Sequence, residues 1–161
     1  MKINLYAFKA IYLHEMDRFR RTLTQSVLSP VLTTSLYFIV FGSVIGGYVE
    51  KIDGISYGSY IVPGLLMLTL LTQSISNTSF GIFFPKFNGT IYEILAAPIS
   101  TLEVVLAFVG AGATKTLIVS IIIFITSLFF VDVQVKYPLL MIFLLILVAF
   151  TFALFGFLIG L

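Results

Sequence analysis

Charged and polar residues divide the chain into long apolar runs separated by short polar segments. No charged residue occurs between residues 23 and 49, and three further runs with few charges cover residues 59–84, 102–131 and 138–161. About 20 consecutive apolar residues in a helix span the hydrocarbon core of a bilayer. Each run is long enough, so the pattern predicts four transmembrane helices with these boundaries.

Residues 3–21 have a different pattern, with apolar residues at spacings of three and four. This periodicity predicts an amphipathic helix, and such a helix typically lies in the headgroup plane of a membrane. The weaker alternative is an ordinary surface helix of a soluble domain. The apolar stripe comprises Leu5, Phe8, Tyr12, Met16, Phe19 and Leu23, and the polar face carries His14, Asp17, Arg18 and Arg21.

Composition supports an all-α membrane protein with a single domain over residues 1–161. The chain is 60% hydrophobic and 10% charged, with a mean hydropathy of +1.14, whereas soluble domains are about 25% charged. So few charges cannot cover a globule in water, which leaves lipid as the main solvent. The net charge of +2 is too small to indicate a nucleic-acid partner.

The distribution of basic residues predicts the orientation. The residues that precede the first run include Lys2, Lys9, Arg18, Arg20 and Arg21, whereas the first loop contains only Lys51. Basic residues favour the cytoplasmic side of a bacterial membrane protein. The N-terminus is therefore expected in the cytoplasm. Counting spans then places residues 86–101 in the cytoplasm and residues 48–58 and 132–137 outside.

The partly polar segment 86–101 separates the second and third apolar runs. Gly89 and Thr90 predict a turn and an N-cap, and Glu93 follows Thr90 at the spacing of a capping box. Pro98 is expected to stop the helix that follows. The segment therefore predicts a short cytoplasmic helix that a protein outside the bilayer can bind.

Several polar residues lie at membrane depth. Thr69, Gln73 and Asn77 are spaced by four in the second run, with Ser76 beside them. Such side chains face protein or a water-filled cavity, so two interpretations remain open, a substrate pathway or hydrogen bonding between helices. Lys115 lies deep in the third run. We expect it to snorkel or to pair with a polar group on another helix rather than to contact a substrate.

Small residues recur at spacings that allow close helix packing. Gly42 and Gly46, and again Gly156 and Gly160, have GxxxG spacing, which is a weak indication of a helix contact. Residues 110–116 superficially resemble a phosphate-binding loop but lack the required GxxxxGK[ST] spacing. Helix packing explains this segment better.

No arrangement of residues points to catalysis or to a metal site. The chain contains no cysteine, and its one histidine, His14, lies on the polar face of the first helix. Glu50, Asp53 and Asp132 lie in predicted loops, so they form no carboxylate pair at membrane depth. We therefore expect no enzyme activity, no cofactor and no bound metal.

Three features of the chain resemble the membrane subunit of a bacterial ABC-2 type transporter, close to the inner-membrane transport permease subgroup. The resemblance covers essentially the whole chain, and its third feature is the most specific. The features are an amphipathic helix leading into a span with Leu28-Ser29-Pro30, the start of the second span at Tyr60-Ile61-Val62-Pro63-Gly64-Leu65, and Gly89-Thr90-Ile91-Tyr92-Glu93-Ile94-Leu95 followed by Pro98 and Ser100.

The resemblance implies the permease subunit of an ATP-driven exporter in the bacterial inner membrane. It implies two permease copies, identical or related, and two cytoplasmic ATPase subunits that supply the energy. Residues 3–21 would be its connecting helix and residues 86–101 its coupling helix. Family members typically have more spans, so we expect an N-terminal fragment of a longer protein. The substrate is not implied, and the alternative is a non-transporting membrane scaffold or assembly protein. The residues implied in coupling are Gly89, Thr90, Glu93, Leu95, Pro98 and Ser100.

Overall fold

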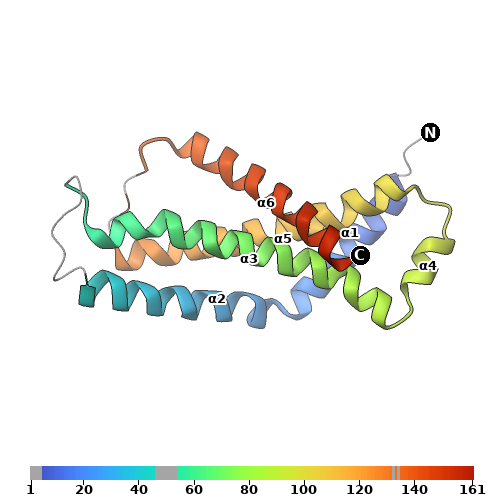
Figure 1. The fold of residues 1–161 in the computed structure, drawn as a ribbon, viewed down its shortest axis with the longest axis horizontal. Helices are drawn as coiled ribbons and strands as arrows, with labels where there is room; N and C mark the ends of the chain where they lie inside the picture. Colours follow the sequence, from blue (N-terminus) through green and yellow to red (C-terminus); the bar gives the residue numbers. More distant parts are fainter. Residues whose placement is uncertain (1–4, 46–53, 132, 134) are drawn as a thin grey trace.

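The computed structural model describes residues 5–45, 54–131, 133 and 135–161. This part of the chain forms helices joined by short connections (Figure 1). In chain order they are α1 (Leu5–Arg21), α2 (Leu23–Tyr37), the π-helical segment η1 (Phe38–Ile45), α3 (Tyr57–Phe87), α4 (Ile91–Ala96), α5 (Thr101–Phe130) and α6 (Pro138–Gly160).

Four of these helical stretches are long and apolar enough to cross a membrane: Leu23–Phe41, Tyr57–Phe87, Thr101–Phe130 and Pro138–Gly160. The first stretch consists of α2 and the first residues of η1, and the other three coincide with α3, α5 and α6. The predicted all-α membrane fold with four spans is therefore confirmed. The predicted second span, 59–84, is exceeded at both ends, because Ser56 caps α3 early and the helix continues through Pro85.

The helix α5 is the centre of the bundle. It contacts α1, α2, α3 and α6, and more than half of its most apolar stretch is buried, against less than a third for each of the other spans. Figure 1 shows α2, α3 and α5 lying along the long axis, with α6 running obliquely across α3 and α5. The helices α1 and α4 lie at the same end of the bundle, where α3 ends and α5 begins.

Two clusters of buried apolar side chains hold the helices together. One lies between α3, α5 and α6, and the other joins the end of α1 to α2, η1, α3 and α5. Lipid is as apolar as these side chains, so close packing rather than removal from water stabilises such contacts. The first cluster contains Leu70, Ile82, Phe108, Val109, Ala113, Ala149, Ala153 and Phe157. The second contains Phe19, Phe38, Val62, Leu66, Val119 and Ile123.

The glycines of α6 bring its backbone onto α3. A Cβ atom added at Gly156 would lie 2.5 Å from the carbonyl oxygen of Ile75, and one at Gly160 would lie 2.7 Å from that of Ser79. The GxxxG spacing of α6 is therefore a true packing contact. In α5, a Cβ atom at Gly112 would overlap the side chain of Thr78. This contact supports packing as the reason for the small residues at 110–116.

Some sequence predictions fall outside the described residues. Among them are the second glycine of the pair at 42 and 46, and the loop residues Glu50, Lys51, Asp53 and Asp132. The predicted loops at 48–58 and 132–137 are described only in part, and the first of them ends where Ser56 caps α3.

Candidate functional site

The short helix α4 is exposed at the end of the bundle where α1 lies (Figure 1). None of its residues is buried. Ile94 packs against the cluster between α3, α5 and α6, and this contact holds the helix in place. Tyr92 and Leu95 are 72% and 70% exposed, and Glu93 is exposed between them. The outer side of α4 therefore carries a small apolar and acidic surface, formed by Tyr92, Glu93 and Leu95.

The predicted capping box between Thr90 and Glu93 is wrong. The backbone of Thr90 is already helical (φ −67°, ψ −13°), and its side chain makes no capping bond to α4. An N-cap residue normally has an extended backbone, which turns its side-chain oxygen toward the free amides of the first turn. The Thr90 hydroxyl donates instead to the carbonyl oxygen of Pro85 at 3.4 Å. Thr90 thus stabilises the end of α3 rather than the start of α4.

The capping box of this region lies at the start of α5. Ser100 has an extended backbone (φ −80°, ψ 149°). Its hydroxyl accepts from the Glu103 amide at 3.3 Å, and its own amide donates to the Glu103 carboxylate at 3.0 Å. Ser100 and Glu103 match the S-x-x-E pattern, so the sequence contained this signal. The box fixes the point where α4 is joined to α5.

The backbone between α3 and α5 explains two further predicted residues. Gly89 has a φ of +78°, in the left-handed region that glycine adopts without a steric penalty. It turns the chain away from α3. At the other end α4 stops at Ala96, and Ala97 is extended (ψ 147°). The ring of Pro98 disfavours a helical backbone at the residue before it, which accounts for this stop.

The four polar residues predicted to line a pathway or a helix interface have different surroundings in the structure. Asn77 lies at the contact with α5, where its side-chain amide donates to the Thr116 hydroxyl at 3.4 Å and to the Gln73 side chain at 3.5 Å. Thr69 donates to the carbonyl oxygen of Leu65 in its own helix. Ser76 is exposed. Only Asn77, with Gln73 beside it, connects this polar face to another helix.

Three buried hydroxyl groups were not singled out from the sequence. Ser74 and Thr78 on α3 and Ser120 on α5 are at most 2% exposed. Their side-chain oxygens have no hydrogen-bond partner within the described part of the chain. The spacing of four between Ser74 and Thr78 was the available signal, since it places both on one side of α3. These residues add buried polar groups to α3 and α5 beyond the four that were predicted from the sequence.

The most strongly buried charges join α1 to α5. Lys115 Nζ lies 2.7 Å from Glu15 Oε2, and Arg18 Nη2 lies 2.9 Å from the same oxygen. The side chains of Lys115 and Glu15 are 4% and 3% exposed, while that of Arg18 is 34% exposed. The prediction that Lys115 finds a polar partner on another helix is therefore confirmed, and the partner is Glu15.

Glu15 is a further residue that was not predicted from the sequence. It lies four residues before Phe19 and three after Tyr12, so it falls on the apolar side of α1. A carboxylate on that side was the signal. Tyr12 lies one turn before Glu15, and its hydroxyl donates a hydrogen bond to the Thr114 hydroxyl at 3.0 Å. The helix α3 also passes close by, because a Cβ atom at Gly81 would lie 3.4 Å from the Glu15 carboxylate. Three helices therefore meet at Glu15.

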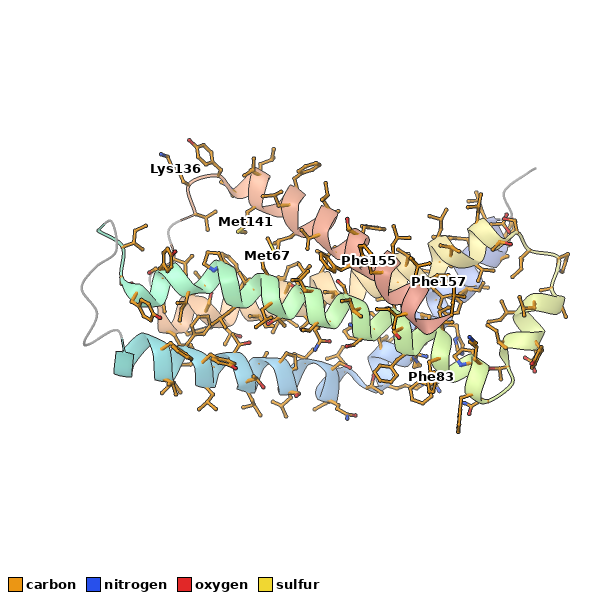
Figure 2. The ribbon with its side chains drawn as sticks, viewed as in Figure 1. Met67, Phe83, Lys136, Met141, Phe155 and Phe157 are labelled. Carbon is orange, nitrogen blue, oxygen red and sulfur yellow. The ribbon has the colours of Figure 1, made fainter. Side chains whose placement is uncertain are left out.

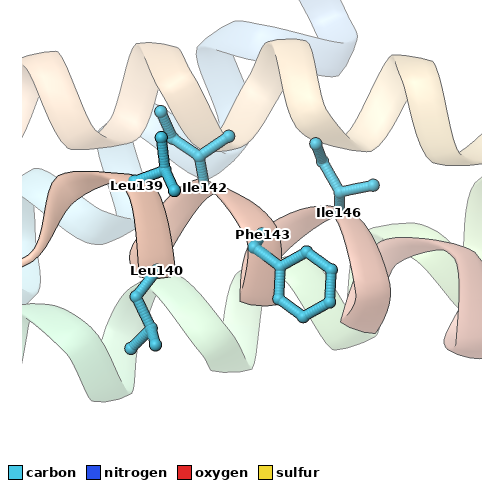
Figure 3. A pocket seen from close by; sticks show the side chains of 5 residues that line it. All are labelled: Leu139, Leu140, Ile142, Phe143 and Ile146. Atoms are coloured by element: carbon cyan, nitrogen blue, oxygen red, sulfur yellow. The ribbon is translucent and has the colours of Figure 1, made fainter.

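An apolar hollow on α6 offers no comparable chemistry. Figure 3 shows its lining side chains, all from the first part of one helix: Leu139, Leu140, Ile142, Phe143 and Ile146. None of them has a polar group that would orient a substrate. The described residues also contain no group of His, Cys, Asp and Glu side chains that could hold a metal ion.

The sequence matches the ABC-2 type transporter family over residues 6–161. It is 38% identical over 160 residues to the protein named inner membrane transport permease YadH from Escherichia coli strain K12. The proteins of the same name from Escherichia coli O157:H7 and Shigella flexneri match equally well. The aligned region covers 99% of this chain and 62% of each relative. No solved structure matches the chain significantly.

Proposed function

Because this chain belongs to the ABC-2 type transporter family, we propose that it forms part of the membrane permease of an ATP-binding cassette exporter. The relatives that it matches are named as inner membrane transport permeases, which supports this role and a place in the bacterial inner membrane. The observation that carries the proposal is the exposed surface of α4. It lies between two long helices and is covered by no other described part of the chain.

The proposed partner at α4 is a separate cytoplasmic ATPase subunit of the ATP-binding cassette class. Tyr92 and Leu95 offer apolar area to a groove on that subunit, and Glu93 offers a charge for orientation. Aromatic side chains that become buried commonly dominate such interfaces. A second permease copy, identical or related, would complete the assembly in the membrane, where lipid surrounds the remaining apolar faces.

The mechanism follows from how α4 is joined to its neighbours. The helix α3 is 31 residues long and α5 is 30, so both extend from α4 to the far end of the bundle. The capping box at Ser100 fixes the start of α5. When the ATPase subunits close on ATP, α4 would move as a rigid body, and α3 and α5 would tilt with it. Tilting of packed helices is a common route to alternating access.

We propose that the end of the bundle with α4 faces the cytoplasm. The helix α1 carries Lys9, Arg18, Arg20 and Arg21, and the last turn of α3 carries Lys86. The positive-inside rule assigns such basic residues to the cytoplasmic side. Lys136 lies at the opposite end (Figure 2). Asn77 and Gln73 would then lie along α3 between the two ends, either at a helix interface or beside a substrate pathway.

The test uses the full-length protein, tagged and purified from its own bacterial membrane with associated proteins. An ATP-binding cassette ATPase should co-purify. Replacing Tyr92 and Leu95 together with alanine should remove the ATPase from the purified complex while insertion is unchanged. Replacing Leu139 with alanine is the matched control, since Leu139 is 84% exposed at the start of α6, away from α4.

Two results would contradict the proposal. One is a stable, inserted protein with which no ATPase purifies, and this would favour the non-transporting scaffold. The other is an ATPase that remains bound when both side chains of α4 are removed, which would place the docking surface elsewhere.

A further inference from the structure

The buried carboxylate of Glu15 is shared between two cations on different helices. Oxygen Oε2 of Glu15 lies 2.7 Å from Lys115 on α5 and 2.9 Å from Arg18 on its own helix. Lys115 and Glu15 are almost completely buried, whereas Arg18 reaches the surface. The two contacts therefore differ in kind, since one is internal to α1 and the other ties α1 to a membrane span.

Separating α1 from α5 would affect the two charges unequally. Glu15 would keep Arg18, because both belong to the same helix. Lys115 would lose the carboxylate and stay at its place in the span. An ion pair that loses one partner leaves an uncompensated buried charge, which is strongly unfavourable, and a charge within a span is costly in any case. Sliding or detachment of α1 is therefore opposed by Lys115.

The junction between α1 and α2 is also stiff. The amide of Thr22 donates to the Arg18 carbonyl oxygen at 3.2 Å, and the amide of Ser26 donates to that of Thr22 at 2.9 Å. The Thr22 hydroxyl also donates a hydrogen bond to the Arg18 carbonyl oxygen. Hydrogen bonds thus bridge the break between the two helices, so a movement of α1 is passed on to α2.

We propose that the Glu15–Lys115 ion pair latches α1 to α5, so that the two helices move as one body during the transport cycle. This inference rests on the proposed function. Movement of α4 would reach α5 through the Ser100 cap, α1 through the ion pair, and α2 through the junction at Thr22. The first span would follow α4 although it has no direct chain connection to it. Glu15 and Lys115 are positioning residues in this scheme, since they act through the helices.

The test uses the full-length transporter with its ATPase in proteoliposomes, with any cysteines outside this chain replaced. In the Glu15→Cys/Lys115→Cys double variant the latch is lost, and substrate-stimulated ATP hydrolysis should fall by about 2- to 30-fold. A short bis-maleimide that joins the two cysteines should restore it. If the cross-linked protein stays uncoupled or stops transporting, α1 and α5 must separate during the cycle and the proposal is wrong.

A matched control separates the latch from the neighbouring charge. Arg18→Gln removes the partly exposed cation but leaves Glu15 with Lys115, so coupling should stay within twofold of wild type. The Glu15→Leu/Lys115→Met variant addresses folding, because an apolar replacement of a buried ion pair is often neutral for stability. It should assemble with the ATPase normally and still show weakened coupling. Wild-type coupling in this variant would overturn the latch.

A second readout keeps the latch testable if the proposed function fails. Spin labels at Asp17→Cys on α1 and Leu106→Cys on α5, both exposed positions, report the distance between the helices without requiring transport. The distance distribution should broaden when Glu15→Leu/Lys115→Met is added. An unchanged width would overturn the latch, whereas a wild-type protein without ATPase stimulation would overturn only the proposed function.

Discussion

At the scale of single residues, a side chain acts as a helix cap only where the backbone presents it to the free amides. Thr90 and Ser100 are both hydroxyl residues followed by a glutamate three positions later. Ser100 is extended and completes a capping box, whereas Thr90 is helical and bonds backward to α3. The same spacing therefore has different consequences at the two ends of one connection.

The first prediction concerns this difference. Ser100→Ala removes the hydroxyl that accepts from the Glu103 amide, and loss of such a cap costs about 0.5–2 kcal/mol. The melting temperature of the purified protein in detergent should fall. Thr90→Ala is the control, and it should have a smaller effect because it removes only one long contact. An equal loss in both variants would contradict the assignment of the cap.

The second prediction concerns the buried charges. Glu15→Gln leaves Lys115 buried without an anion, and breaking a buried pair in this way costs about 3–5 kcal/mol. Lys115→Met should be milder, because Glu15 keeps its contact with Arg18. Thermal unfolding in detergent would measure both. If Lys115→Met proves the more damaging change, Arg18 does not compensate the carboxylate.

The third prediction concerns Glu93, which is exposed and takes no part in a cap. If it contacts the proposed ATPase, Glu93→Gln should leave expression and insertion unchanged and lower ATPase stimulation or export. Asp17→Asn is the matched control, since it neutralises another exposed carboxylate at the same end. Full activity of Glu93→Gln would exclude a role for this charge in coupling.

At the scale of helices, the close contact between α3 and α6 depends on two glycines of α6, which have no side chain to hold the backbones apart. Gly156 and Gly160 let the backbone of α6 reach the carbonyl oxygens of Ile75 and Ser79, and the buried Ala149 and Ala153 continue the same close approach. Where the contact ends, α6 diverges from α3 and exposes large apolar side chains such as Leu139. Small residues thus determine where α6 crosses its neighbour.

The fourth prediction tests this contact. Gly156→Ala places a Cβ atom 2.5 Å from the Ile75 carbonyl oxygen, so the helices must move apart, and such overpacking costs about 1–3 kcal/mol. Gly64→Ala is the control, because a Cβ atom there meets nothing within 4 Å and alanine favours the helix. The melting temperature should fall in the first variant and stay or rise in the second. Equal effects would contradict the close contact.

At the scale of the whole molecule, the spans place α4 and the start of α6 at opposite ends of one bundle. The helices α1 and α4 share one end, and the connection into α6, with Lys136, lies at the other (Figures 1 and 2). The central α5 contacts four α-helices and η1. This arrangement lets a force at one end act on several spans together.

The fifth prediction concerns orientation across the membrane. Single cysteines at Glu93 and Lys136 of this cysteine-free chain should react with a membrane-impermeant maleimide from opposite sides, with Glu93 on the cytoplasmic side. Labelling of both from the same side would exclude the proposed topology.

The number and type of the spans could be predicted from the pattern of apolar residues alone. Apolar runs of sufficient length must be helical in lipid, because each backbone amide and carbonyl must find its partner within the segment. This local requirement needs no knowledge of neighbouring helices. The family resemblance was also readable from local motifs, above all the segment from Gly89 to Leu95.

The pairs of distant residues that meet became visible only in the folded chain. Glu15 and Lys115 are separated by 100 positions, and no local pattern shows that two charges of opposite sign share one buried site. The choice between Thr90 and Ser100 as the cap depended on backbone angles that follow from how α3 ends. Pairing between distant residues is set by the packing of whole helices against one another. The periodicity of one helix shows which of its faces is apolar, but it does not show which helix packs against that face.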